Sequence, residues 1–263
     1  MSFEFHNNPE VYFEHQDLNT TKYVIPFIEN KTKIIPGMQV LEIGCAEGGV
    51  LKSFLKKGCI VTGVELSQSR LDVADKLFAE EIKAGKANFI CADIYDVGDK
   101  LKSKFDLIVL KDTIEHIFNQ EKLMKFLKSV LKENGKIFLG FPPWQMPFGG
   151  HQQVSRNKIF NILPYIHLLP TPVYRFILRS FDRNDEFIQA LFEIKETRLS
   201  IEHFEKIVKN AGYKIDLVKF YLINPIYEMK FKLKPREQFT LISKIPYLRN
   251  FVTTTCYYLL SIK

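Results

Sequence analysis

A glycine-rich turn between an apolar strand pattern and a helical pattern is the feature of this sequence that most restricts its fold. In the segment MQVLEIGCAEGG, residues 38–49, an apolar run reaches Glu42, and glycines that begin at Gly44 lead directly into the helical pattern of residues 50–55. Glycines let the backbone pass close under a ligand, and the free N–H groups of the helix start face that ligand. The segment therefore predicts a nucleotide-type pocket in an α/β fold.

The spacing of the glycines leaves more than one ligand open. Gly44, Ala46 and Gly49 nearly match the dinucleotide fingerprint G-x-G-x-x-G, a short pattern that recurs by chance and serves several ligands. The same strand–turn–helix unit could also be purely structural. Glu42, two residues before the first glycine, adds a carboxylate that helps to choose among these alternatives.

With this acid, the turn resembles motif I of the class I S-adenosylmethionine-dependent methyltransferases. In that motif an acid followed by glycines at alternate positions surrounds the amino-acid end of the cofactor, and here the pattern runs Glu42, Gly44, Ala46 and Gly48. Ala46 departs from the usual glycine, so the turn must tolerate a methyl group there. The resemblance implies S-adenosyl-L-methionine as the cofactor, with Cys45 among the residues that bind it.

Two later strand patterns end on acids at places where a nucleoside would lie. CIVTGVEL, residues 59–66, closes on Glu65, and a carboxylate about 20 residues beyond the turn can accept from both ribose hydroxyls, whether of S-adenosylmethionine or of NAD. Leu66 follows as a further expected cofactor contact. ANFICADI, residues 87–94, ends with Asp93 and Ile94; the resemblance implies that Asp93 receives the adenine amino group and that Ile94 packs on the ring. An exposed turn aspartate is the alternative.

The fourth strand and its exit loop, FDLIVLKDTIEHI at residues 105–117, favour a methyltransferase over an NAD enzyme. KDTIEH resembles the E-H-[IV] signature of the ubiquinone-biosynthesis-like small-molecule branch, methyltransferase types 11, 12 and 23. We expect Lys111 to contact the cofactor. His116 is either a general base near the methyl acceptor or a structural histidine that bonds the loop, and His151, after the fifth strand, is a second candidate base.

One α/β domain with a large insertion suits 263 residues better than two independent cores. We expect a doubly wound, Rossmann-like fold with a mostly parallel seven-stranded sheet and an aromatic-rich helical cap inserted after the fifth strand. The expected parts are an N-terminal helical segment (1–36), a cofactor-binding core (37–141), the inserted cap (142–198), and a C-terminal helix and strand pair (199–263). Six of the 12 prolines fall between 142 and 172, which argues against a second independent domain.

Four local expectations accompany this fold. Residues 18–33 should form a helix that Pro26 shortens or kinks, with Tyr23 and Phe27 packing on the core or closing over the cofactor. Residues 119–135 should form an amphipathic helix that Gly135 stops. Two further helices should start at caps, Ser67 and Ser200.

The insertion is expected to select the acceptor. Ligands of open α/β sheets bind at the carboxyl ends of strands, so we expect acceptor contacts from Trp144, Phe148 and Gln152. The aromatic residues could instead form a small core of the cap itself. The insertion favours a partly apolar small-molecule or lipid-linked acceptor met at a membrane surface, with a glycan-linked acceptor as the rival. The basic residues that would support the membrane contact are Arg156, Lys158, Arg175 and Arg179.

The expected chemistry is direct displacement at the sulfonium methyl, with oxygen as the preferred acceptor atom. We expect no metal, because no carboxylate or asparagine pair follows the fifth strand to bind a hard cation. The alternatives are an NAD-dependent oxidoreductase on the same strand–helix logic and a non-catalytic cofactor-binding subunit.

Charge and cysteine content suggest partners and compartment. The formal charge of +7 is more simply explained by lysines on solvated helix faces than by a nucleic-acid partner. The first residues, MSFEFHNNPEVYFEH, do not have the pattern of a secretory signal. The four cysteines contain no C-x-x-C pair and are expected to be reduced, buried thiols of a cytoplasmic protein. The oligomeric state stays open.

Overall fold

The computed structural model describes residues 8–155, 157, 159–181 and 184–263, and its centre is one sheet in the order β3-β2-β1-β4-β5-β8-β6-β7. The strands are β1 (Gln39–Ile43), β2 (Ile60–Glu65), β3 (Ala87–Cys91), β4 (Phe105–Lys111), β5 (Leu131–Phe141), β6 (Tyr213–Ile223), β7 (Arg236–Glu237) and β8 (Thr255–Ile262). β1 to β5 run parallel, and β8 is antiparallel to both of its neighbours, β5 and β6. The expected α/β class and mostly parallel sheet are confirmed.

The expectation of seven strands is wrong, because the described residues form eight. The additional strand is β7, which has two residues and pairs antiparallel with the end of β6. Both of its residues, Arg236 and Glu237, are charged and exposed, so no alternation of apolar and polar residues marks it in the sequence. The antiparallel pair of β6 and β8 agrees with the closing strand pair that the sequence suggested.

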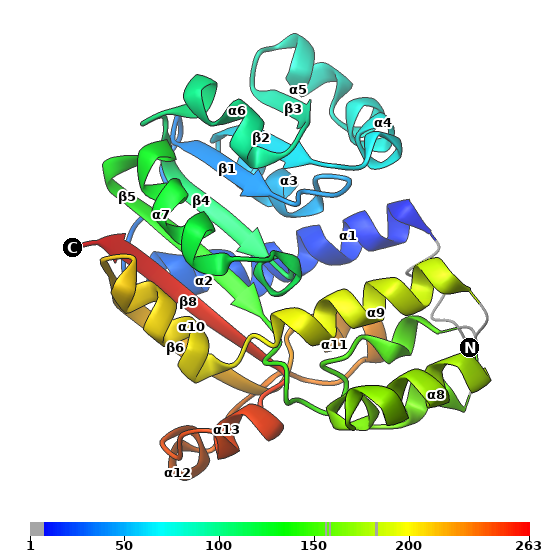
Figure 1. The fold of residues 1–263 in the computed structure, drawn as a ribbon. Helices are drawn as coiled ribbons and strands as arrows, with labels where there is room; N and C mark the ends of the chain where they lie inside the picture. The colour runs from blue at the N-terminus through cyan, green and yellow to red at the C-terminus, as the bar shows by residue number, and fades with distance from the viewer. Residues whose placement is uncertain (1–7, 156, 158, 182–183) are drawn as a thin grey trace.

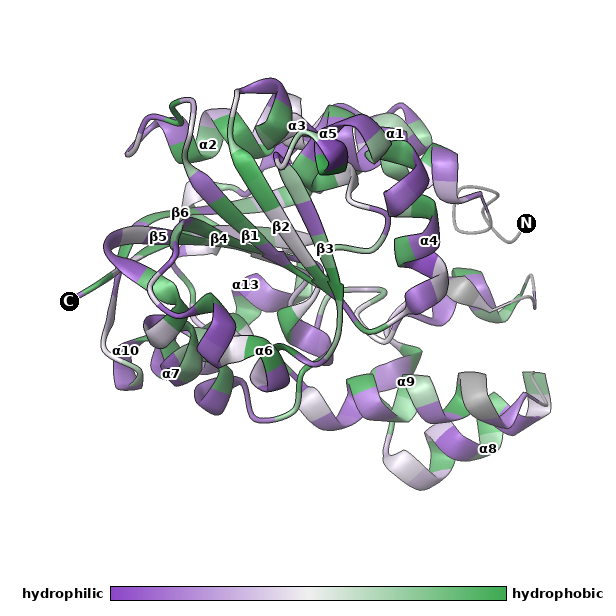
Figure 2. Cartoon of the chain, turned by 90° about the horizontal axis from the view of Figure 1, so that it is seen from above, coloured by the Kyte–Doolittle hydropathy of each residue, from purple (hydrophilic) through white to green (hydrophobic). Residues whose placement is uncertain are grey.

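Helices cover both faces of the sheet (Figure 1 and Figure 2). The helices are α2 (Ile25–Glu29), α3 (Gly49–Lys56) and α4 (Gln68–Leu77) on one face, and α6 (Ile94–Leu101), α7 (Gln120–Val130) and α10 (Ile201–Asn210) on the other. Val40 and Leu41 of β1 are both fully buried but belong to different core clusters. Successive strand side chains point to opposite faces, so one strand can supply both clusters.

The N-terminal helical segment starts earlier than expected. In place of one helix over 18–33, the chain forms α1 (Pro9–Asn19), a π-helical segment (Thr20–Val24) and α2. Pro26 lies in the first turn of α2, where a missing N–H is tolerated, and the wider π turn precedes it. Phe27 is buried as expected, whereas Tyr23 is half-buried and its hydroxyl donates to Glu228.

Two helix ends also differ from expectation. α7 ends at Val130, before Gly135, because Leu131 takes extended backbone and pairs with Phe105 of β4. Gly135 lies inside β5. Ser200 caps α10, with its hydroxyl accepting from the His203 N–H at 3.1 Å, but Ser67 precedes α4 without such a bond.

The residues between β5 and α10 form short turns of 3-10 helix and two α-helices, α8 (Thr171–Phe181) and α9 (Asp185–Thr197). α8 and α9 lie side by side on the side of the molecule towards which β4 and β5 point (Figure 1). They pack on a cluster of their own: Phe160, Ile166, Tyr174, Leu178, Ile188, Leu191 and Phe192. At least these aromatic residues of the insertion form its internal core.

The remaining elements are short. They are α5 (Ala79–Lys83), the 3-10 turn η3 (Ile114–His116), α11 (Ile226–Phe231), α12 (Thr240–Ser243) and α13 (Leu248–Phe251). α11 lies between β6 and β7 in the chain and packs against α1. Among the helices that the structure describes, none has the length and apolar character needed to cross a bilayer.

Candidate functional site

The sheet order reverses between β1 and β4, and the turns that follow these two strands press against each other. The Gly44 N–H donates to the Val64 carbonyl at 2.8 Å, which ties the turn after β1 to β2. Gly44 has φ +71°, and a Cβ there would lie 2.8 Å from the Thr113 methyl group in the loop after β4. Only glycine fits both constraints. Such a reversal point leaves a crevice at the carboxyl ends of the strands.

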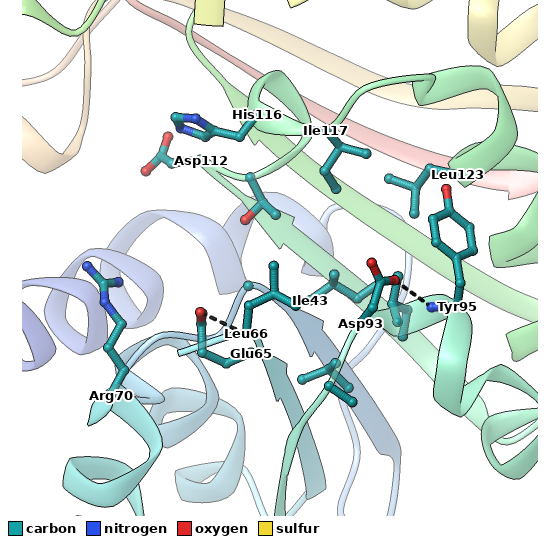
Figure 3. A pocket seen from close by; sticks show the side chains of 15 residues that line it. Ile43, Glu65, Leu66, Arg70, Asp93, Tyr95, Asp112, His116, Ile117 and Leu123 are labelled. Carbon is teal, nitrogen blue, oxygen red and sulfur yellow. Dashed lines mark hydrogen bonds between the residues drawn. The ribbon is translucent and has the colours of Figure 1, made fainter. Parts of the chain in front are cut away.

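A cavity of about 390 Å³ lies in this crevice (Figure 3). Its walls include residues at the ends of three strands: Glu65 and Leu66 at the end of β2, Asp93 and Ile94 after β3, and Asp112 and His116 after β4. Gly44 forms part of the floor. The fold therefore brings together five of the expected cofactor-binding residues: Gly44, Glu65, Leu66, Asp93 and Ile94.

Glu65 joins the exit of β2 to the glycine turn. Its Oε2 accepts from the Ala46 N–H at 3.0 Å, and its Oε1 accepts from the N–H groups of Leu66 and Ser67 at 2.9 and 3.0 Å. Ala46 has φ +49°, a left-handed conformation that costs a residue with a Cβ about 1–2 kcal/mol, so the bond from Glu65 supports a strained position. Oε2 accepts this one bond, so it has capacity for a second donor, and Glu65 lines the cavity.

Asp93 and its neighbours, at the end of β3, form another part of the wall of the first cavity. The Asp93 carboxylate accepts from the Tyr95 N–H at 2.9 Å and so caps α6, while the side chain itself is exposed (Figure 3). Ile94 is buried and faces the cavity. Asp93 is thus an exposed turn residue, as the alternative from the sequence had it, and it also lines the cavity. Its expected contact with the adenine amino group stays a prediction.

The other expected cofactor residues lie beneath or beside the turn. Glu42 is only 2% exposed, and burial raises the pKa of its carboxyl well above the usual value. Cys45 is buried against Gly63. Gly48 has φ +84° and starts α3. Glu42, Cys45, Gly48 and Lys111 are not among the described residues that line the cavities.

Lys111 is engaged by its chain neighbour. Its ammonium lies 2.6 Å from the Asp112 carboxylate. Burial opposes the charge on both groups, but their mutual attraction prevails: the pKa of Lys111 is raised and the pKa of Asp112 is lowered. The pair keeps Asp112 ionised at the edge of the cavity.

A second cavity of about 330 Å³ adjoins the first, since Arg70, Asp112 and His116 line both. Segments far apart in sequence build it. They are α1 with Tyr12 and Gln16, the loop after β4 with Glu115, the start of the insertion with Met146, Phe148 and His151, and α11 with Tyr227 and Lys230. The two candidate bases meet here, with the ring centroids of His116 and His151 4.9 Å apart at an angle of 83°.

Partial burial shifts the titration of the groups around these histidines. Burial lowers the pKa of His116, which leaves its imidazole neutral and able to accept a proton, and 42% of its side chain stays accessible. Burial raises the pKa of Glu115 well above its usual value. Glu115, His116 and His151 offer ligand atoms within 4.8 Å of one another, so they could hold a metal ion; the metal-free reaction expected from sequence stays a prediction.

A third cavity of about 300 Å³ continues from the second, sharing Met146, Phe148 and Tyr227 with it. Its additional walls are mostly apolar and include Ile162, Phe231 and Leu233. Of the three expected acceptor contacts, Phe148 lines the second and third cavities.

The other two expected acceptor contacts are enclosed within the insertion. Trp144 packs edge-on against His167 at 4.5 Å, and its carbonyl bonds the His167 ring at 2.8 Å. Gln152 is fully buried and donates to the Leu163 carbonyl at 2.8 Å. Neither side chain is among the described residues that line the second or third cavity.

Sequence reasoning missed several residues that line these cavities. Asp112 stands inside the KDTIEH segment and could have been noticed from its place between Lys111 and the expected base. Arg70, Tyr227 and Lys230 had no such signal, because they lie in helices whose apolar periodicity says nothing about a ligand. They reach the site only through tertiary packing.

Comparison with known proteins finds methyltransferases in both sequence and structure. A family model described as a methyltransferase domain matches residues 13–218. A ubiquinone biosynthesis O-methyltransferase of Coxiella burnetii is 31% identical over 140 residues, which is 53% of this chain and 58% of the relative. The enzyme of the same name from Idiomarina loihiensis is 33% identical over 112 residues, which is 43% of this chain and 45% of the relative. The chain thus spans about half the length of these curated relatives.

Solved structures show the same fold. A structure described as a sarcosine dimethylglycine methyltransferase from Galdieria sulphuraria covers 92% of this chain and 85% of its own, with a TM-score of 0.60 and 11% identity. A geranyl diphosphate methyltransferase bound to S-adenosylmethionine covers 92% and 84%, with a TM-score of 0.57 and 14% identity. At these identities the likeness concerns the fold alone.

Proposed function

The chain belongs to the class I S-adenosylmethionine-dependent methyltransferases, and from this premise we propose that it transfers the methyl group of the cofactor to an oxygen of a small-molecule acceptor. The observation that carries the proposal is the joining of two cavities at Asp112 and His116, one at the strand ends and one beside the insertion. A donor in the first cavity and an acceptor in the second would meet at this junction.

The residues of the first cavity fit the cofactor. Glu65 has a carboxylate oxygen with acceptor capacity for a ribose hydroxyl, and Asp93 and Ile94 stand where an adenine would be bonded and packed. Gly44 lines this cavity, and a Cβ there would collide with Thr113. When bound there, S-adenosylmethionine supplies an electrophilic methyl group on a sulfonium. The protein binds and orients both reactants, and alignment alone can contribute much of the acceleration.

A proton must leave a hydroxyl acceptor, and the second cavity contains two imidazoles for it. His116 is neutral at physiological pH because burial lowers its pKa, and it lines both cavities. His151 lies against it. We propose that one of these two histidines accepts the proton from the hydroxyl, and we favour His116 because it lies at the junction of the two cavities.

We further propose a partly apolar acceptor, either a small molecule or one linked to a lipid. The apolar third cavity, which opens from the second, supports this choice over a glycan-linked acceptor. The names of the two curated relatives support oxygen as the acceptor atom.

Contact with a membrane surface is part of the same proposal. The outer face of α8 exposes Phe176 to 74%, together with exposed Arg175 and Arg179. Arg156 and Lys158, the other two basic residues expected to contribute, lie outside the described residues. We place the protein in the cytoplasm, which is supported by four free cysteine thiols in the described chain. The expectation that all four are buried is wrong for Cys91, which is exposed at the end of β3.

The test is transfer of a labelled methyl group. The full chain is incubated with S-adenosylmethionine labelled in its methyl carbon and with a panel of 4-alkylphenols and alkyl carboxylic acids. We expect the label in an extractable product, formed in equal amount with S-adenosylhomocysteine, and a methyl NMR signal typical of carbon bonded to oxygen. Label on nitrogen or carbon would refute the acceptor atom. NAD reduction or cofactor binding without transfer to any acceptor would instead support the oxidoreductase or the non-catalytic subunit.

A further inference from the structure

We propose that Lys230 binds an anionic oxygen of the acceptor and so makes the enzyme selective for molecules that join an acidic group to an apolar chain. The inference rests on the proposed function and names the chemistry of its acceptor. Neither the glycine turn nor the strand-end acids point to Lys230, which lies in α11, a six-residue helix between β6 and β7.

The position of Lys230 is fixed by the packing of α11. Ile226 at the start of the helix is 4% exposed, and Glu228 on its outer side bonds Lys22 and Tyr23 of the N-terminal helical segment. Tyr227 and Lys230, three residues apart and hence on one face of the helix, line the second cavity. The helix therefore presents a hydroxyl and an ammonium to the space beside His116.

The other charged side chains around this space have partners of opposite charge. Arg70 lies 3.8 Å from Glu47. Asp112 is shared between Lys111, which it bonds at 2.6 Å, and Lys230, whose charge also lowers the pKa of Asp112. An anion on the acceptor would bring an opposite charge to Lys230, which lines the second cavity.

The burial of Lys230 agrees with a role in binding an anion. It lowers the pKa of Lys230 to about 8, with Asp112 opposing the decrease and Lys111 adding to it. His15 of α1 and His151 of the insertion complete the titratable surroundings. Burial and then Lys230 lower the pKa of His15, and His151 is among the groups that lower the pKa of Asp112. A cation destabilised in this way gains more from an anionic ligand than a fully solvated lysine does.

The apolar requirement comes from the neighbouring residues of the same segment. Phe231 and Leu233 follow Lys230 in the chain and line the third cavity, to which Tyr227 and Phe148 lead from the second. An acceptor held at Lys230 by its acidic group can therefore extend its apolar part along Ile162, Phe231 and Leu233. One short segment, residues 227–233, would thus contact both the acidic group and the apolar part of the acceptor.

The test compares decanoate with decanol, which share a chain and differ in charge. Both are titrated calorimetrically into the full chain saturated with S-adenosylhomocysteine, with EDTA present so that no metal on Glu115, His116 and His151 can hold the carboxylate. We expect decanoate to bind at least about tenfold more tightly than decanol, the low end expected for a charge-assisted bond. Lys230→Met should remove this preference without weakening decanol, and Lys230→Arg should keep it.

Lys234→Met is the matched control, because it removes an exposed lysine of the same segment. It should leave the preference for decanoate unchanged. In the wild type, decanoate affinity should fall as pH rises through about 8 and Lys230 loses its proton, whereas Lys230→Arg should hold its affinity there. Circular dichroism establishes that each variant is folded.

Equal affinity of the wild type for decanoate and decanol would overturn the inference, as would a preference that survives Lys230→Met. The S-adenosylhomocysteine titration of the wild type reports separately on the proposed function. If that cofactor product does not bind, the methyltransferase proposal fails, and the decanoate preference measured without it still decides the role of Lys230.

Discussion

The donor side and the acceptor side of this molecule are built in different ways. The donor side comes from the ends of strands β1 to β4 and the segments that follow them, within residues 43–123. The parallel pairing of the strands sets its geometry. The acceptor side comes from α1, the start of the insertion and α11, which are separated by most of the chain. A site at strand ends follows from sheet topology, whereas a site between such distant segments depends on how they pack.

The two sides also differ in how their residues are held. On the donor side, Glu65 is fixed by three backbone N–H groups, and Gly44 by a close approach to Thr113. On the acceptor side, Lys230 and His151 lie on a short helix and on a loop. We expect changes on the donor side to alter cofactor affinity and those on the acceptor side to alter turnover or acceptor affinity. The following predictions test that separation.

Removal of the insertion should have the largest effect. Replacing residues 152–192 with a short Gly-Ser linker should abolish methyl transfer but leave S-adenosylhomocysteine affinity within about threefold, because the described lining of the first cavity contains none of these residues. Calorimetry and a labelled-methyl assay measure the two effects. As a control, Phe176→Ala on the exposed face of α8 should change neither in the absence of a membrane. A shortened protein that unfolds or loses the cofactor would show that the insertion belongs to the common core.

Loss of the proposed general base, His116, should have the second-largest effect. His116→Ala should lower kcat by roughly 10²- to 10⁴-fold and remove the acidic limb of the pH–rate profile. A base works when deprotonated, and burial lowers the pKa of His116 from 6.5, so the wild-type rate should fall only as pH drops below that value. His203→Ala, an exposed histidine on α10, should keep wild-type behaviour. Full turnover in both His116→Ala and His151→Ala would leave catalysis to alignment alone.

A substitution in the glycine turn of the donor side should lower the stability of the protein. Gly44→Ala combines a left-handed backbone with overlap against Thr113 and should lower the free energy of unfolding by about 2–4 kcal/mol. Gly85→Ala is the matched control, since Gly85 has φ +68° but open space around a Cβ; strain alone should cost about 1–2 kcal/mol. Urea unfolding measures both. Equal losses would mean that the contact between the two turns contributes nothing.

Glu65→Ala should have the smallest of these effects. Loss of a charge-assisted bond to the ribose should weaken S-adenosylhomocysteine binding by about 1.5–3 kcal/mol, or roughly 10- to 150-fold. Glu65→Gln keeps an acceptor oxygen and should lose less. If a folded Glu65→Ala binds like the wild type, the assignment of this acid to the ribose is wrong.

The difference between the two sides explains what the sequence could and could not reveal. Glu65 and Asp93 could be placed because strand patterns are periodic and parallel strand ends share one edge of a sheet. The same reasoning misplaced the end of α7, where pairing of Leu131 with β4 overrides a glycine stop. Trp144 drew attention as an aromatic beside a strand end, yet it packs against His167.

Lys230 is a clearer example of a site residue that the sequence alone could not reveal. It lies in a helix of six residues, among several other lysines, and its sequence neighbourhood does not distinguish it from them. Its place in the cavity depends on α11 docking against α1 and on the bond from Lys22 of the π-helical segment to Glu228. Both contacts join residues more than 200 positions apart in the chain. Such a contact has no local pattern, so it becomes visible only in the folded structure.

The central claim is that the strand ends of β1 to β4 hold the nucleoside of S-adenosylmethionine. Calorimetric titration of the wild-type chain with S-adenosylhomocysteine and, separately, with NAD tests it most directly. We predict micromolar, one-to-one binding of S-adenosylhomocysteine and no measurable heat from NAD. Saturable binding of NAD with no binding of S-adenosylhomocysteine would contradict the claim.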